Sequence, residues 1–371
     1  MKILFSPSIS PAAWAIGEAL LPPGFTIDIL VKDPERRTKQ LEQADFLMGF
    51  LRSMPLRPDD YPHLRNIKLI QLLSAGYDGI DIERLRASGI PLSNNGGANS
   101  YAVSEHAIML MLAVYRRLPA LDRLVRAGQW KSSKLGEEQE HELAGRTVGI
   151  VGAGMIGRTV ARRLSGFEVN LLYYDPVRVP AADEAKLKLT YCELDDLLRQ
   201  SDVVSLHAPA NASTHRLICD RTLALMKRDA ILINTARGEL VDEAALYRAL
   251  KEERIWAAGL DAFDREPPDP QNPLFTLPNV VLTPHAAGPT WESWPKRFGH
   301  RCQHRARRPR RSAALGRARA ALTAPALRRF CIFAQALDCG YDIQNICILW
   351  SDICELPNGE TALRFGCRTP W

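Results

Sequence analysis

Residues 146–176, RTVGIVGAGMIGRTVARRLSGFEVNLLYYDP, decide the fold that we expect for this chain. Thr147–Val151 is a short apolar run with β-branched residues, and it predicts a buried strand. Glycines follow it directly with the spacing G-x-G-x-x-G, and the residues after them predict a helix. A second apolar run, Val169–Tyr174, predicts the next strand. The order of strand, glycine turn, helix and strand indicates a parallel α/β unit.

The glycines and one acidic residue indicate what this unit binds. Gly152 allows a tight turn, Gly154 lets the backbone approach a pyrophosphate, and Gly157 lets the helix pack closely on the strand. The helix N-terminus then offers free N–H groups to phosphate. Asp175 ends the second strand about 20 residues past the motif, where a carboxylate binds a ribose 2′-OH and repels a 2′-phosphate. A glycine turn can serve packing alone, but the whole pattern favours a dinucleotide site, with NAD preferred to NADP.

Length and composition are typical of a two-domain globular protein. The chain has 371 residues, 46% of them hydrophobic, and a formal net charge of +6. Residues 299–371 hold 12 Arg, no Lys and 5 acidic residues, so the body of the chain is close to neutral and no nucleic-acid partner is expected for it. Pro7, Pro11 and Glu18 interrupt the N-terminal apolar stretch, so we expect no signal peptide. No apolar helix approaches the ~20 residues of a membrane span, so no membrane partner is expected.

Cysteines are distributed as unevenly as the charge. Cys192 and Cys219 lie in the body, and the other six lie in residues 299–371. No C-x-x-C pair and no His/Cys cluster with zinc spacing occurs, so we expect no metal site. The body is therefore interpreted as a reduced, cytoplasmic protein.

Residues 1–99 are expected to form a first α/β domain with a parallel sheet. Its predicted elements are strands at Lys2–Phe5, Phe25–Val31, Phe46–Phe50 and Ile67–Leu73, and a helix at Pro11–Leu20. The turn Ser74–Gly79 follows a buried strand. Its amides suit an anion, and an ordinary turn explains it equally well.

Residues 100–289 are expected to form a second domain, after the Asn- and Gly-rich boundary Pro91–Asn99. It begins with a predicted long helix, Ser100–Leu118, in which His106 has either a functional or a structural role. Further elements are predicted at Leu194–Leu198 (helix) and at Val203–Leu206, Ala230–Asn234, Ala257–Leu260 and Val280–Leu282 (strands). In open parallel sheets ligands bind beyond the carboxyl ends of the strands, so the residues that follow these strands are site candidates.

Three such residues, Arg237, Glu266 and His285, form a chemically coherent set. An arginine fork binds the carboxylate of a 2-keto acid and polarises its carbonyl. A histidine titrates in the range needed to protonate the carbonyl oxygen. A carboxylate beside the histidine fixes its tautomer and stabilises the imidazolium. Each residue alone also fits an ordinary loop position.

The ordered motifs of the chain resemble those of the D-isomer-specific 2-hydroxyacid dehydrogenases. These motifs, within residues 45–297, are LLSAGYDGID, YAVSEHA, VGIVGAGMIG, YYDP, LHAP, INTARGELVDEAAL, GLDAFDREPP and PNVVLTPHAAG. The family includes glyoxylate/hydroxypyruvate reductases and 3-phosphoglycerate dehydrogenases. The resemblance implies two doubly wound parallel-sheet domains, the second a Rossmann NAD-binding domain, and a homodimer joined through the cofactor domain.

The resemblance also implies roles for individual residues. Arg237 would bind substrate, Glu266 would pair with the histidine, and His285 would be the acid/base. Amides near Ala75 and Gly76 would hold the substrate carboxylate. The residues implied around NAD are Gly152, Gly154, Met155, Ile156, Gly157, Asp175, His207, Pro209, Thr235, Asp261 and Gly288.

The function expected from these features is NAD(H)-dependent hydride transfer between the nicotinamide and a D-2-hydroxy acid or 2-keto acid. A substrate of the glyoxylate or hydroxypyruvate type is favoured. A different class remains open, an NAD(H)-sensing binding protein like the C-terminal-binding-protein corepressors, which share this fold and motif set. Turnover that vanishes with His285→Ala distinguishes the two.

The resemblance stops near Phe298. Residues 290–298 are expected to begin a helix that returns to the first domain. Residues 299–371 form an atypical tail, and the composition of its first part is typical of a GC-rich coding region read out of frame. We expect a frameshift after about Phe298. The alternative is a genuine appended arginine-rich segment able to bind nucleic acid.

Overall fold

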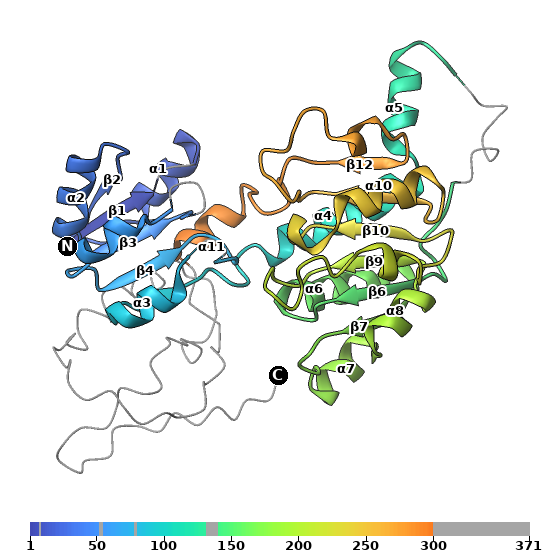
Figure 1. Ribbon diagram of the computed structural model, residues 1–371, viewed down its shortest axis with the longest axis horizontal. Coiled ribbons are helices and arrows are strands. Elements are labelled where there is room, and N and C mark those ends of the chain that lie inside the picture. The colour runs from blue at the N-terminus through green and yellow to red at the C-terminus, as the bar shows by residue number, and fades with distance from the viewer. Residues whose placement is uncertain (7–8, 52–54, 78–79, 131–139, 300–371) are drawn as a thin grey trace. The chain divides into compact units, whose positions relative to one another are not determined.

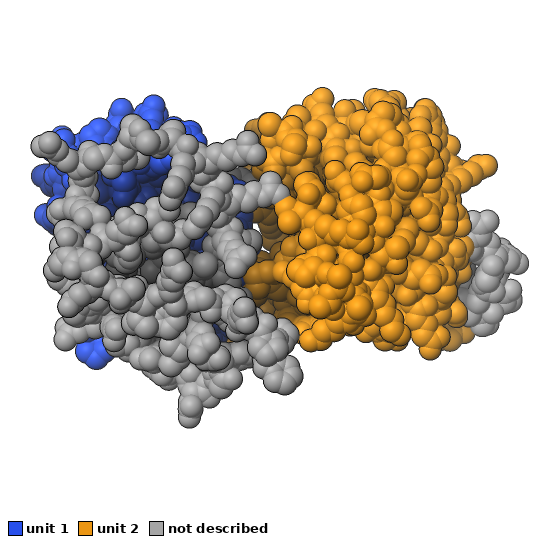
Figure 2. Space-filling model, turned by 90° about the horizontal axis from the view of Figure 1, so that it is seen from below, with its two compact units in different colours: residues 1–96, 294–371 blue, residues 97–293 orange. Residues whose placement is uncertain are grey.

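The computed structural model describes residues 1–299 except 7–8, 52–54, 78–79 and 131–139 (Figure 1). The sequence predictions for the tail, residues 300–371, therefore lie outside the described residues. The described chain divides into two compact units, Met1–Gly96 with residues 294–299, and Gly97–Ser293. Figure 2 colours the two units separately.

Unit 1 is built on a five-stranded sheet with the order β2-β1-β3-β4-β5, in which every neighbouring pair is parallel. The strands are β1 (Lys2–Ser6), β2 (Thr26–Ile29), β3 (Phe46–Gly49), β4 (Leu69–Leu72) and β5 (Leu92–Ser93). The helices are α1 (Pro11–Ala19), α2 (Pro34–Gln43), the 3₁₀ turn η1 (Pro58–His63), α3 (Ile82–Ser88) and α11 (Ser293–Gly299). All the strands predicted for this unit are present. The one predicted at 25–31 is shorter, since β2 covers only Thr26–Ile29 and the residues on either side of it form loops.

The last helix completes the core of unit 1. Phe298 of α11 is buried and packs with Phe5 and Trp294. Gly17 on α1 makes room for it, since a Cβ on Gly17 would lie 2.7 Å from the Phe298 ring. Helix α11 begins at Ser293 rather than at residue 290, where the sequence places the start of the return helix.

Unit 2 is built on a seven-stranded parallel sheet with the order β12-β11-β10-β9-β6-β7-β8. The strands are β6 (Thr147–Val151), β7 (Asn170–Tyr174), β8 (Leu189–Tyr191), β9 (Val203–Leu206), β10 (Ile231–Asn234), β11 (Ala257–Leu260) and β12 (Val280–Leu282). The chain runs outward from β6 through β7 to β8, and then crosses back to β9 on the other side of β6. The strand order therefore reverses between β6 and β9, and in open α/β sheets such a point is where ligands bind.

Helices cover both faces of this sheet, as parallel sheets require (Figure 1). They are α4 (Ser100–Tyr115), α5 (Leu118–Arg126), α6 (Met155–Leu164), α7 (Ala181–Leu187), α8 (Leu194–Gln200), α9 (Asp220–Leu223) and α10 (Glu243–Lys251), with 3₁₀ turns η2 (Ser165–Phe167), η3 (Gly238–Leu240) and η4 (Pro273–Thr276). Along β10, Ile231 and Ile233 join the core that α4 and α6 cover, whereas Leu232 joins the core that α8 and α10 cover. Both sheet faces are thus buried.

The long helix predicted at 100–118 is shorter than expected. Helix α4 ends at Tyr115, and Arg117 adopts a left-handed conformation with φ +47 that turns the chain. Pro119 then lies in the first turn of α5, where the missing N–H of proline costs nothing. The prediction was wrong because the apolar pattern continues across this break.

Candidate active site

The glycine turn after β6 has no room for side chains at two of its three glycines. Gly152 has φ +96, and a Cβ there would lie 2.7 Å from the backbone nitrogen of Ala208, which follows β9. A Cβ on Gly157 would collide with the carbonyl oxygen of Gly152. A Cβ on Gly154 would meet nothing within 4 Å. The main chain is therefore open at Gly154, as close approach to a pyrophosphate requires.

Helix α6 presents its N-terminus at this open point. Gly154 is the N-cap residue, and among the described residues no side chain caps the helix. Met155 and Ile156 form its first turn, in which Ile156 packs against the core. The first N–H groups and the positive end of the helix dipole are thus available to an anion.

Asp175 follows β7 directly and is held by backbone amides. Its Oδ2 accepts a hydrogen bond from the Ala153 N–H (2.9 Å), and its Oδ1 accepts one from the Val177 N–H (2.8 Å). The neighbouring cation Arg178 forms an ion pair with Glu184 (2.9 Å). The carboxylate is therefore fixed beside the glycine turn, where the sequence expects it to meet a ribose.

His285 and Glu266 form a close pair on the loops after β12 and β11. The Nδ1 atom of His285 lies 2.8 Å from both carboxylate oxygens of Glu266. The Phe263 N–H donates to Oε1 of Glu266 at 3.1 Å and helps to orient it. Because the carboxylate accepts the Nδ1 proton, Nε2 is the ring nitrogen available for proton exchange with another molecule.

Arg237 lies on the loop after β10, in contact with the loop that carries Glu266. Asn234 fixes the Arg237 loop, since its side chain donates to the Arg237 carbonyl (2.8 Å) and accepts from the Ala236 N–H (3.0 Å). A Cβ on Gly238 would collide with the backbone of Phe263. The two loops thus meet backbone to backbone, and only glycine permits this contact.

Asp261 directly follows β11 and holds the loop that carries the histidine. Its side chain is 1% exposed, and its two oxygens accept the N–H groups of Ala286 (2.7 Å) and Ala287 (3.0 Å). The His285 N–H donates to the Asp261 carbonyl at 2.9 Å. Gly288 is buried at the end of this loop.

Two polar atoms near the switch point are buried without partners. They are Nδ1 of His207 and Oγ1 of Thr235, neither of which has a hydrogen-bond partner among the described residues. The other ring nitrogen of His207 lies 2.9 Å from Ser205 Oγ. Burial lowers the pKa of His207 to about 4, so the ring is neutral at pH 7. Pro209 follows on the same loop, and its carbonyl accepts from Thr214 Oγ1.

Ala75 and Gly76 belong to unit 1, on the loop that follows β4. The Ala75 carbonyl accepts from the Asn94 side chain (2.8 Å), and the Gly76 carbonyl accepts from Ser74 Oγ (2.7 Å). The loop is thus held by its carbonyl groups.

Comparison with known proteins places the chain in a family. The family described as "D-isomer specific 2-hydroxyacid dehydrogenase, NAD binding domain" matches residues 108–287. The glyoxylate reductase of Korarchaeum cryptofilum is 40% identical over 260 residues, which cover 69% of this chain and 76% of that protein. The hydroxypyruvate reductase of Thermotoga maritima is 38% identical over 231 residues, which cover 62% of this chain and 73% of that protein. The chain belongs to the D-isomer specific 2-hydroxyacid dehydrogenase family.

A solved structure supports the same assignment. The D-lactate dehydrogenase of Aquifex aeolicus, complexed with NAD and lactic acid, aligns with a TM-score of 0.70 at 29% identity, covering 80% of this chain and 92% of that chain. The predicted family, α/β fold and cofactor are thus confirmed, and the protein is an NAD-dependent 2-hydroxyacid dehydrogenase. NAD fits the residues present in this dehydrogenase: the open Gly154 turn suits a pyrophosphate, and the unpartnered atoms of His207 and Thr235 suit a polar ring substituent.

Three neighbours of the predicted site residues were missed by sequence reasoning. They are Gly238, which lets two loops touch, Ser205, which binds His207, and Thr283, which donates to Asp261 at 2.6 Å. Each lies within two residues of a predicted site residue, so its position was the available signal.

Two further findings concern metals and membranes. Among the described residues, no group of three or more His, Cys, Asp or Glu side chains is arranged to hold a metal ion. Within the same residues no helix has the length and apolar character needed to cross a membrane.

Proposed function

We propose that this dehydrogenase interconverts a short 2-keto acid of the glyoxylate or hydroxypyruvate type and its D-2-hydroxy acid. The contact between His285 and Glu266 carries the proposal, because it puts an acid/base pair on the loops at the carboxyl ends of β11 and β12. The glyoxylate and hydroxypyruvate reductases among its relatives support the substrate class.

The proposed chemistry divides among three side chains. His285 Nε2 gives a proton to the carbonyl oxygen during reduction and removes it during oxidation. Glu266 stabilises the imidazolium and holds its tautomer. The Arg237 guanidinium binds the substrate carboxylate and polarises the carbonyl. Bound NAD(H) supplies the hydride acceptor or donor at C2.

We propose that the cofactor is held by the edge of the sheet where the strand order reverses. Gly152, Gly154 and Gly157, with the first turn of α6, would bind the pyrophosphate, and Asp175 the adenosine ribose. His207, Pro209, Thr235, Asp261 and Gly288 would surround the nicotinamide half. In the proposed domain organisation, residues 1–99 bind substrate through the amides near Ala75 and Gly76, residues 100–289 bind NAD, and residues 290–298 return to the first domain.

The first test is NADH oxidation by the purified full chain. Glyoxylate, hydroxypyruvate and a bulkier, branched 2-keto acid are offered in parallel, with His285→Ala as the comparison. We expect turnover of one of the two short acids, lowered about 100-fold or more in His285→Ala because the proton donor is lost. Bound NADH without turnover would instead support the sensing function, and preference for the bulky acid would reject the substrate class.

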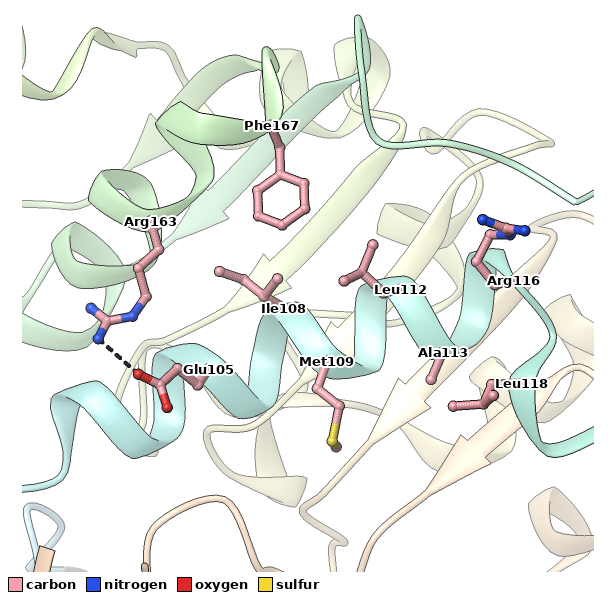
Figure 3. Close-up of a pocket in the computed structure, with 9 residues that line it drawn as sticks. All are labelled: Glu105, Ile108, Met109, Leu112, Ala113, Arg116, Leu118, Arg163 and Phe167. Carbon is pink, nitrogen blue, oxygen red and sulfur yellow. Dashed lines mark hydrogen bonds and ion pairs between the residues drawn. The ribbon is translucent and has the colours of Figure 1, made fainter. Parts of the chain in front are cut away.

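We also propose that two copies associate through the cofactor domain. Helix α5 has an apolar face, yet none of its residues is buried in the chain. Beside it, α4 lines an apolar hollow of about 670 Å³, whose lining includes Ile108, Met109 and Leu112 (Figure 3). Met109 (44%) and Val125 (58%) are exposed. Exposed apolar surface of this extent is typical of a protein interface, and a second copy is the occupant that the family resemblance implies.

A cytoplasmic location is proposed for this enzyme. Both described cysteines, Cys192 and Cys219, are free thiols. Free cysteines are typical of a reducing compartment.

A further inference from the structure

A chain of hydrogen bonds leads from helix α4 to the loop of His285. The Nε2 atom of His106 lies 2.9 Å from Thr283 Oγ1 and 3.4 Å from Asp261 Oδ1. The Thr283 hydroxyl donates to the same carboxylate oxygen at 2.6 Å. Asp261 in turn accepts the amides of Ala286 and Ala287, the two residues that follow His285.

The protons in this series of hydrogen bonds have one consistent assignment. Thr283 has a single hydroxyl proton, which goes to Asp261, so its oxygen accepts the Nε2 proton of His106. Burial lowers the pKa of His106 and outweighs the opposing effect of the Asp261 carboxylate, so it favours the neutral ring. A neutral ring with its proton on Nε2 donates a hydrogen bond to Thr283 Oγ1, and the Thr283 hydroxyl then donates to Asp261.

The conformation of His285 explains why its loop needs support. His285 has φ +52, a left-handed conformation that costs free energy for a residue with a Cβ. Its N–H is shared between the carbonyls of Asp261 (2.9 Å) and Thr283 (3.1 Å). Such a conformation persists only when the surrounding contacts fix it, and Asp261 provides three of these contacts through its carboxylate and carbonyl.

We propose that His106 and Thr283 are positioning residues for catalysis, which orient Asp261 so that its carboxylate holds the His285 turn in its active geometry. The proposal rests on the proposed acid/base role of His285. His106 touches none of the groups proposed to bind substrate, and it acts only through Thr283 and Asp261. A displacement of the histidine by a fraction of an ångström lowers kcat without loss of ground-state binding.

The test compares variants that remove a hydroxyl or a ring N–H with variants that keep one. Thr283→Val and His106→Phe break the chain, whereas Thr283→Ser and His106→Gln retain a donor at each place. We expect the first pair to lower kcat about tenfold with KM and the Kd for NADH within about twofold of the wild type, and the second pair to restore most of the activity. The double variant Thr283→Val/His106→Phe should be no slower than the slower single variant, because both changes break one chain.

Amide hydrogen exchange supplies a second readout that needs no turnover. In Thr283→Val we expect the amides of Ala286 and Ala287 to exchange about tenfold faster than in the wild type, and in Thr283→Ser at the wild-type rate. If the wild type turns over no keto acid, the proposed function fails while this exchange result still decides the positioning role. Unchanged exchange in Thr283→Val, equal damage from Thr283→Ser, or a kcat loss that follows a fall in Tm would overturn the inference.

Discussion

At the scale of single residues, the proposed site of the dehydrogenase consists of pairs that are distant in the sequence and adjacent in space. His285 and Glu266 are 19 positions apart, and their contact spans two loops that only the order β11-β12 brings together. The histidine side chain is 39% exposed and the glutamate side chain 17%. The carboxylate is thus shielded beside the ring and the ring remains partly exposed, as the proposed acid/base role requires.

Removal of the Glu266 carboxylate charge should affect turnover of the keto acid more than its binding. For Glu266→Gln we expect kcat to fall about 100-fold with little change in KM, because the amide neither fixes the tautomer firmly nor stabilises the imidazolium. Steady-state kinetics with the best keto acid measures this. Asp264→Asn removes an exposed acid two residues away and is the matched control. Equal kinetics for the two variants would argue against the pair.

The lowered pKa of His207 leads to a prediction about how the stability of the fold depends on pH. Its pKa is about 4 in the folded protein against an ordinary value of 6.5, so the unfolded chain binds the proton more readily. Stability is therefore lost as pH falls through this window, by about 3 kcal/mol. Urea unfolding between pH 7 and pH 4 should show a shallower loss for His207→Asn than for the wild type. His215→Asn, which removes an exposed histidine, should leave the slope unchanged.

At the scale of elements, burial decided which parts could be predicted. β6, β9, β11 and β12 match the predicted residues, because each is a short apolar run bounded by polar loops. β8 was missed because it is only three residues long and half-exposed. The site candidates Arg237, Glu266 and His285 followed from their places beyond strand ends. The link from His106 through Thr283 could not be predicted, since α4 meets β12 only after the chain has folded.

Two glycines at the start of helix α6 are expected to have different roles, Gly157 in packing and Gly154 in NADH binding. Gly157→Ala should lower Tm by several degrees, because the new methyl group collides with the Gly152 carbonyl. Gly154→Ala should leave Tm unchanged and weaken NADH binding about tenfold, because the methyl group enters open space that we assign to the pyrophosphate. Thermal unfolding and NADH fluorescence titration measure the two effects. Gly166→Ala also meets nothing within 4 Å and should change neither. A similar fall in Tm for all three variants would contradict this division of roles.

At the scale of the whole molecule, the exposed apolar residues of α4 and α5 determine the expected assembly. Leu112→Arg and Val125→Glu each place a charge in the proposed interface, where burial of an unpaired charge is costly. We expect dimers of the wild type and monomers of both variants by size-exclusion chromatography with light scattering. Val177→Glu, at another exposed apolar position (54% exposed), is the control and should remain dimeric. A monomeric wild type would reject the interface.

The return of α11 to unit 1 sets the order in which the chain can fold during synthesis. Phe298 fills the space above Gly17, and the Asn95 side chain donates to the Arg297 carbonyl at 2.7 Å. The ribosome therefore releases the first ninety-six residues long before the helix that closes their core emerges. Unit 2 can complete its sheet in the meantime, because its strands are contiguous in the sequence. Unit 1 is thus synthesised first but completed last. The apolar surface that α11 covers stays exposed to chaperones while unit 2 is translated.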